Sequence, residues 1–80
     1  MSKTEKLLQR VLGGAADHNF AFDDLCYLLT RLGATTRQGK GSHVLFNLDG
    51  AIINLQNQGG QAKAYQVAQI REILKTKRGL

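Results

Sequence analysis

The side chain best suited to chemistry in this sequence is His43, which follows the short run Gly39-Lys40-Gly41-Ser42. An imidazole titrates at about pH 6.5, so it can accept or donate a proton at neutral pH. RNA carries its own nucleophile, the 2′-hydroxyl, whose attack on the adjacent phosphate needs only proton transfer and stabilisation of negative charge. We therefore expect His43 to act as a general base or acid in RNA cleavage. DNA lacks the 2′-hydroxyl and would not react in this way.

Basic residues accompany His43 in the C-terminal part of the chain. Residues 25–80 hold eight basic and two acidic side chains, residues 1–24 hold three and four, and the whole chain carries +5. Such an excess attracts a polyanion or an acidic protein. The residues that we expect to bind the RNA backbone are Arg37, Lys40, Gly41, Ser42 and Lys63.

Other kinds of site are poorly supported. A Walker A loop needs Ser or Thr after its lysine, but Gly41 follows Lys40, and a dinucleotide fingerprint would need glycine where Val44 stands. Cys26 is the only cysteine, so an internal disulfide and a four-thiolate zinc site are excluded. We expect no metal and no cofactor. We also expect His18 to be a solvated or capping residue and Cys26 a small buried hydrophobe.

The elements that position His43 follow from turn signals and apolar periodicity in a chain of 80 residues, which is one domain. We predict helices over residues 3–12, from Phe22 to Gly33, and after Lys63. A linker over 15–21 joins the first two helices, and strands cover 34–38, 42–48 and 51–56. The predicted fold is α+β in the order α-α-β-β-β-α, with the helices on one face of an antiparallel sheet. The longest apolar run, residues 25–29, is too short to cross a bilayer.

The pair Asp49-Gly50 predicts a two-residue turn between the last two strands. A tight turn there pairs Leu48 with Ala51 and His43 with Gln56, which separates the two faces of the sheet. The core face then holds Val44, Phe46, Leu48, Ile53 and Leu55. The open face holds His43, Leu45, Asn47, Ile52, Asn54 and Gln56.

Several blocks of the sequence together resemble a known family, the HicA toxins of bacterial type II toxin–antitoxin systems. The resemblance covers about residues 20–75 and leaves residues 1–14 as an additional helix. It is carried by the blocks Phe22–Cys26, Leu28-Leu29, Arg31–Gly33, Gly41-Ser42-His43 with Phe46, Ile53–Gln56 and Lys63–Val67.

The resemblance implies a fold similar to a double-stranded RNA-binding domain and cleavage of mRNA in the bacterial cytoplasm, with His43 as the essential residue. It implies no cofactor, and a HicB-type antitoxin as the partner that covers the active face in a hetero-oligomer. Two positions depart from the family pattern. Val44 stands where many members have a second histidine, and Ala64 stands where many have proline.

Two other functions remain open at the level of sequence. The chain could bind structured RNA by shape without cutting it, in which case binding would be tight and salt-sensitive. Its open face, with Leu45 and Ile52 exposed, could instead serve to dock another protein, and this role is compatible with RNA cleavage. If His43 does cleave RNA, the second proton-transfer group is Lys40, a substrate phosphate or water.

Overall fold

Three helices and a three-stranded antiparallel sheet follow one another in the predicted order in the computed structural model, which describes residues 1–80. The predicted α+β fold class is thereby confirmed. The elements are α1 (Lys3–Gly13), a 3₁₀ turn η1 (Asp17–Asn19), α2 (Phe22–Arg31), β1 (Thr35–Gln38), β2 (His43–Leu48), β3 (Ala51–Gln56) and α3 (Ala64–Arg78). Predicted and observed bounds differ by one residue or two.

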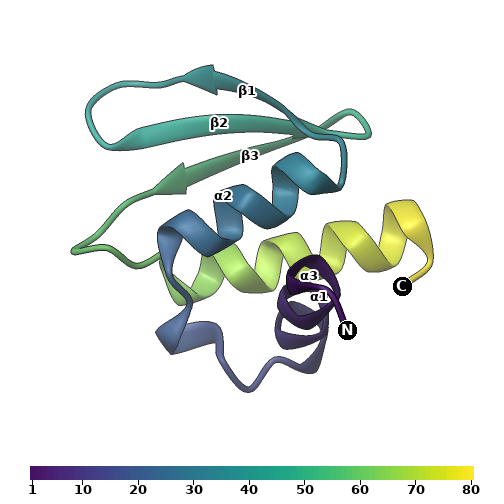
Figure 1. Cartoon of the computed structure of the whole chain (residues 1–80). Helices are drawn as coiled ribbons and strands as arrows, with labels where there is room; N and C mark the ends of the chain where they lie inside the picture. The colour runs from purple at the N-terminus through teal and green to yellow at the C-terminus, as the bar shows by residue number, and fades with distance from the viewer.

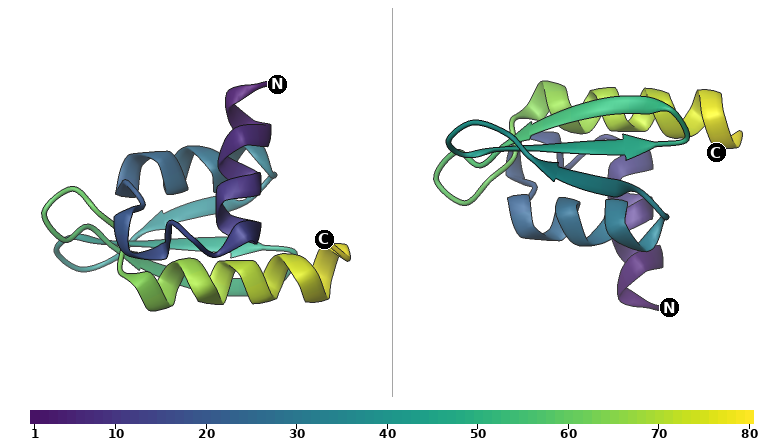
Figure 2. Two further views of the ribbon diagram at one scale, coloured as in Figure 1. Left: turned by 90° about the horizontal axis from the view of Figure 1, so that it is seen from below. Right: turned by 90° about the horizontal axis from the view of Figure 1, so that it is seen from above.

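The elements form layers (Figure 1). The sheet, in the order β1-β2-β3, lies against α2 and α3, and α1 crosses these two helices on their far side (Figure 2). Both α2 and α3 begin at the end of the molecule where the β1–β2 loop lies and run in the same direction. One face of the sheet is therefore covered by helices, and the other, here called the open face, carries no element.

The turn between β2 and β3 sets the register of the sheet. Asp49 and Gly50 have φ angles of 53° and 90°, the left-handed values that a two-residue hairpin turn requires at both central positions. The Asn47 side-chain Oδ1 accepts a hydrogen bond from the Gly50 N–H at 3.0 Å. The pairing His43↔Gln56 through Leu48↔Ala51 is the predicted one. The register, and with it the division into two faces, is confirmed.

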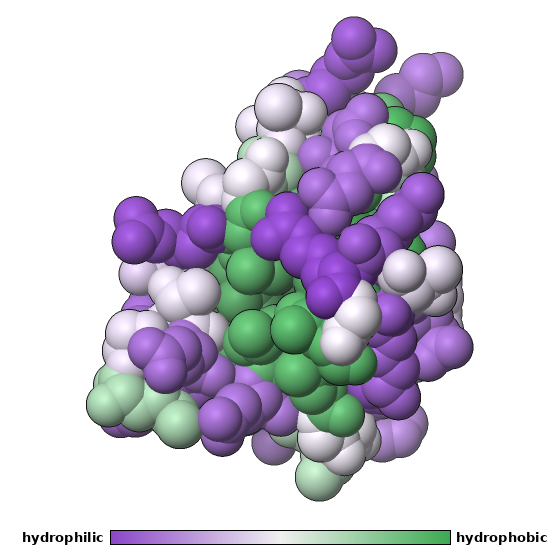
Figure 3. Space-filling model, turned by 90° about the vertical axis from the view of Figure 1, so that its right-hand side faces the viewer, coloured by the Kyte–Doolittle hydropathy of each residue, from purple (hydrophilic) through white to green (hydrophobic).

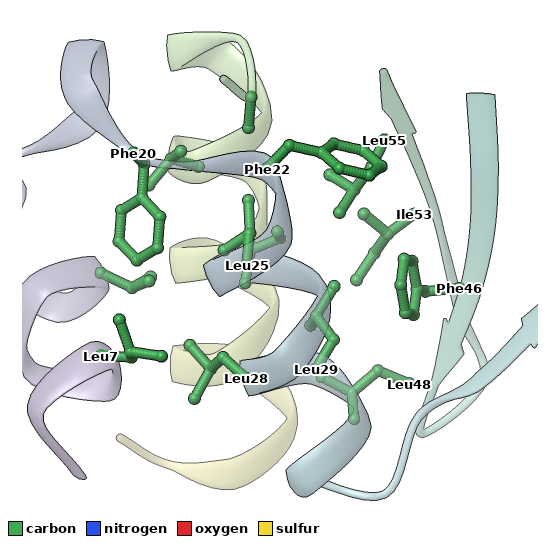
Figure 4. Close-up of a cluster of buried hydrophobic side chains, with 14 of the residues drawn as sticks. Leu7, Phe20, Phe22, Leu25, Leu28, Leu29, Phe46, Leu48, Ile53 and Leu55 are labelled. Carbon is green, nitrogen blue, oxygen red and sulfur yellow. The ribbon is translucent and has the colours of Figure 1, made fainter. Parts of the chain in front are cut away.

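The core lies between the layers and is aliphatic with a few phenylalanines. Figure 4 shows side chains from the sheet, among them Phe46 and Ile53, facing α2, whose other side faces Leu7 of α1. The four inward residues Phe46, Leu48, Ile53 and Leu55 are buried as predicted, and Val44 is half-buried at the margin. On the face where α2 and α3 end, apolar side chains reach the surface between hydrophilic ones (Figure 3).

The segment 15–21 joins α1 and α2 as predicted, and a contact with α3 orders it. Phe20 is completely buried, and Asp17 begins the η1 turn. Arg71 of α3 explains this order, because its guanidinium forms two hydrogen bonds with the Asp17 carboxylate, at 2.9 and 3.0 Å, and one with the Val11 carbonyl at 3.0 Å. The contact joins α1, η1 and α3, and it raises the pKa of Arg71 above its already high value, chiefly through the hydrogen bonds that Arg71 donates to Asp17.

A second arginine ties the far end of α3 to the hairpin turn. Arg78 Nε donates to Asp49 Oδ2 at 2.7 Å, and its Nη2 donates to the Leu32 carbonyl at 2.6 Å. The hydrogen bond from Arg78 lowers the pKa of the Asp49 carboxyl below its ordinary value.

No helix in the structure is both long enough and apolar enough to cross a membrane.

Candidate functional site

The open face presents its side chains in three rows across the strands. Paired residues of an antiparallel sheet share a face, so the register places residues 44–47 of β2 between one residue from β1 and one from β3. The first row is Thr35, Asn47 and Ile52, and the second is Arg37, Leu45 and Asn54. His43 and Gln56 form the third row, which ends at the β1–β2 loop.

The β1–β2 loop holds His43 at the first position of its strand. The Gly39 N–H donates to the His43 carbonyl and the His43 N–H to the Lys40 carbonyl, both at 3.1 Å. A Cβ on Gly39 would lie only 3.1 Å from the His43 Cβ, so a side chain at position 39 would crowd the imidazole. Gly41 has a φ of +61°, in the left-handed region that favours glycine. The two glycines thus let the loop turn closely around His43.

Asn54 orients the imidazole. His43 Nδ1 and Asn54 Oδ1 are 3.0 Å apart, and because an amide oxygen only accepts, Nδ1 donates the proton. In the neutral ring the lone pair therefore resides on Nε2, which is left free to accept a proton from another molecule. In this arrangement the half-buried His43 carries its proton on Nδ1 and leaves Nε2 available to another molecule.

Gln66 of α3 supports Asn54 from the edge of the sheet. It is the only buried polar residue of the chain. Its Nε2 donates to the Asn54 carbonyl at 2.9 Å, and its Oε1 accepts from the Gln56 and Lys63 N–H groups at 3.3 and 3.2 Å. These bonds use outward-facing backbone groups of the edge strand β3, which would otherwise need water. Gln66 therefore couples the start of α3 to the strand that carries Asn54.

A hollow of about 390 Å³ opens beside His43, lined by Gly39, Lys40, His43, Leu45 and Asn54. Nothing covers it, so a polymer can lie across it. The hollow brings together two residues predicted for the site, His43 and Lys40. Lys40 is exposed and provides the only titratable side chain there besides His43.

The other predicted site residues lie around this hollow. Arg37 lines a neighbouring hollow on the same face. Gly41 and Ser42 lie in the exposed β1–β2 loop, and Lys63 directly precedes α3; none of these three lines either hollow. The structure thus places Arg37, Lys40 and His43 on one surface, and leaves Gly41, Ser42 and Lys63 outside both hollows.

The open face has a simple electrostatic character. Its three rows contain no acidic side chain, and Arg37 and Lys40 form no ion pair. The ion pairs of the molecule lie elsewhere and use Lys3, Arg71 and Arg78. The charges near His43 are free to bind phosphate.

The remaining candidates lie away from the open face. His18 is exposed in η1. Cys26 is half-buried in α2, and its burial, followed by the nearby Asp23 charge, raises the pKa of its thiol to about 11. A thiol with this pKa is almost entirely protonated at neutral pH and is a poor nucleophile. No group of three or more His, Cys, Asp or Glu side chains is placed to hold a metal ion.

Sequence reasoning missed the roles of Asn54 and Gln66. The predicted register already placed Asn54 on the face of His43, diagonally across the two strands, which is within reach of long side chains. Gln66 gave no such signal, because its partners depend on how α3 packs against β3.

Comparisons of the chain with protein-family models, with curated proteins and with solved structures found no match in any of the three.

Proposed function

We propose that this protein is an RNA-cleaving toxin of a toxin–antitoxin system, of the HicA type that its sequence resembles. The observation that carries the proposal is the state of His43. Its Nδ1 is held by Asn54, its Nε2 is free, and it lines an open hollow with Lys40 on a face without acidic residues. This arrangement is suited to a proton transfer next to a bound phosphate.

The proposed reaction uses the nucleophile of the substrate. Nε2 of His43 removes the proton of a 2′-hydroxyl, the 2′-oxygen attacks the adjacent phosphorus, and the bond from phosphorus to the 5′-oxygen breaks. The products are a 2′,3′-cyclic phosphate and a free 5′-hydroxyl. The proton for the departing 5′-oxygen comes from water, from a substrate phosphate or from Lys40, the only other titratable group of the hollow.

Lys40 supplies positive charge beside the reacting phosphate, and Arg37 in the neighbouring hollow adds to the positive potential of the same face. Negative charge grows on the phosphoryl oxygens as the 2′-oxygen attacks, and a fixed cation lowers the energy of that state. Neither side chain is paired with an acidic residue of the protein, so no ion pair has to break when RNA binds. Lys63 and the N–H groups of Gly41 and Ser42 are proposed to hold the RNA backbone further from the reacting phosphate.

The open face also supports the proposed control by a partner. It exposes Ile52, with 59% of its surface accessible, beside the half-buried Leu45 and two free cations. An acidic antitoxin of the HicB type would match these charges and cover the apolar surface. A partner bound there would block His43 directly, so inhibition would need no conformational change in the toxin.

The test is a gel assay of a defined single-stranded RNA with three proteins: wild type, His43→Ala and His18→Ala. The second histidine is a matched control, because it is exposed and lies on η1 away from the open face. We expect wild type and His18→Ala to produce the same fragments. His43→Ala should be slower by about 10²-fold or more, the usual range for loss of a general base. Equal cleavage by all three proteins would contradict the proposal.

The assay also separates cleavage from binding alone. A protein that only binds RNA by shape would retard the RNA on a native gel without creating new ends. In that case His43→Ala would weaken the salt-sensitive retardation rather than remove a reaction. Absence of fragments with wild type, at protein concentrations that fully retard the RNA, would favour this binding function.

A further inference from the structure

A second hollow lies next to the His43 hollow on the open face. It has a volume of about 320 Å³, and its lining includes Thr35, Arg37, Leu45, Asn47 and Ile52. The aliphatic side chains Leu45 and Ile52 provide apolar surface, and Ile52 is largely exposed. The hollow therefore offers apolar surface to a planar ring and polar groups at its margin, as small-molecule sites commonly do.

The polar margin of this hollow consists mainly of hydrogen-bond donors. Arg37 forms no ion pair, so its guanidinium retains its planar array of N–H donors. The Oδ1 of Asn47 is already engaged by the Gly50 N–H at 3.0 Å, which leaves the amide N–H₂ as the available end of that side chain. Thr35 adds one hydroxyl. A ligand for this hollow must therefore present acceptors.

The two hollows are spaced as neighbouring units of a polymer. Leu45 lines both of them and follows His43 by two positions on β2. Two residues of a strand span about 7 Å, a separation comparable to that of adjacent phosphates in an extended single strand. RNA whose phosphate lies at His43 would place a neighbouring base over Leu45 and Ile52.

We infer that this second hollow is a nucleobase subsite that prefers guanine. Guanine presents two acceptors, O6 and N7, on one edge, and an arginine fork binds both at once. Adenine and cytosine place an amino donor on the corresponding edge, opposite the donors of Arg37 and Asn47. Uracil offers a carbonyl there but not the paired acceptors. The inference rests on the proposed RNA-cleaving function for its ligand class, and concerns base recognition rather than the reaction.

The experiment measures binding of hexanucleotides that cannot be cleaved. Four fluorescent 2′-fluoro RNA hexamers carry uracil at five positions and differ only in the third base, which is G, A, C or U. Their dissociation constants are measured by fluorescence anisotropy with wild type, Arg37→Ala and Arg31→Ala. Arg31 is exposed at the end of α2 and serves as the matched control. Cleavage of the matching unmodified RNAs is assayed in parallel.

We expect wild type and Arg31→Ala to bind the G hexamer about tenfold more tightly than the A and C hexamers. Arg37→Ala removes the donors that face the guanine edge, so its preference for the G hexamer should fall below about twofold, and its affinity for all four hexamers should fall as well. Equal binding of all four hexamers by wild type, or a preference for G that survives in Arg37→Ala, would overturn the inference. A guanine preference without RNA cleavage would uphold the subsite and remove the proposed function. RNA cleavage without a base preference would uphold the proposed function and overturn the guanine subsite.

Discussion

At the scale of single residues, the proposed reaction depends on a hydrogen bond that gives His43 one tautomer. The Nδ1–H of His43 donates to Asn54 Oδ1, and this leaves Nε2 as the acceptor for a substrate proton. A histidine at the same position without Asn54 would rotate and would share its proton between both nitrogens. In the proposed reaction Asn54 is thus a positioning residue, which acts through the imidazole.

This role predicts different outcomes for two substitutions of Asn54. Asn54→Ala removes the acceptor and should lower the cleavage rate by about tenfold or more, since small losses of orientation are costly to reaction rates. Asn54→Asp keeps an acceptor and adds a negative charge, which favours the protonated imidazole. Its rate should recover at higher pH, with the midpoint of the pH profile displaced upward from that of wild type.

The measurement is the cleavage rate between pH 5 and 9 for the three proteins, with thermal unfolding as a control for folding. Asn54 is exposed, so neither substitution should change stability by more than about 0.5 kcal/mol. A purely structural role for Asn54 would lower the rate equally at every pH and leave the midpoint in place. That result would contradict the positioning role.

At the scale of elements, the β2–β3 hairpin holds the site, and its turn is fastened to α3. Asp49 accepts from Arg78, whose guanidinium also reaches the end of α2 through the Leu32 carbonyl. The contact lowers the pKa of Asp49, mainly by the hydrogen bond from Arg78. A carboxyl with a lowered folded-state pKa stabilises the fold above its unfolded-state pKa, and this stability is lost as the pH falls through the folded-state value.

The prediction is a pH-dependent difference between wild type and Asp49→Asn. Asparagine tolerates the left-handed backbone at position 49, where φ is 53°, so the turn is preserved. At pH 7 the substituted protein should unfold at a lower temperature than wild type. The difference should shrink as the pH falls below 3.8, the ordinary pKa of the Asp49 carboxyl. Calorimetry between pH 2 and 7 would measure it, and a difference independent of pH would show that the ion pair does not stabilise the fold.

Local patterns in the sequence predicted the elements well, and they missed contacts between distant segments. The pair Asp49-Gly50 and the alternation on either side were enough for the whole β2–β3 register, because a two-residue turn leaves only one pairing. The order of segment 15–21 was missed because Arg71, which holds Asp17, lies 54 residues away. The same reason applies to Gln66, whose bond to the Asn54 carbonyl exists only once α3 packs beside β3.

At the scale of the whole molecule, the 80 residues form three layers. The sheet carries the candidate site, α2 and α3 form the layer behind it, and α1 forms the third. The open face holds His43, two unpaired cations and two adjoining hollows, and the acidic residues lie elsewhere. The proposed reaction takes place on this open surface, because RNA supplies the nucleophile through its own 2′-hydroxyl, which DNA lacks.

The most direct test of the proposed reaction removes one oxygen atom from the substrate. An RNA that wild type cleaves at a single mapped position is synthesised again with a 2′-deoxy nucleotide on the 5′ side of that bond, and both are incubated with wild type and His43→Ala. We predict that wild type cleaves the all-RNA strand and leaves a 2′,3′-cyclic phosphate that mass spectrometry detects. The deoxy-substituted bond should stay intact with the same protein. Cleavage of the deoxy-substituted bond at the wild-type rate would contradict the proposed reaction and would require an activated water in place of the 2′-hydroxyl.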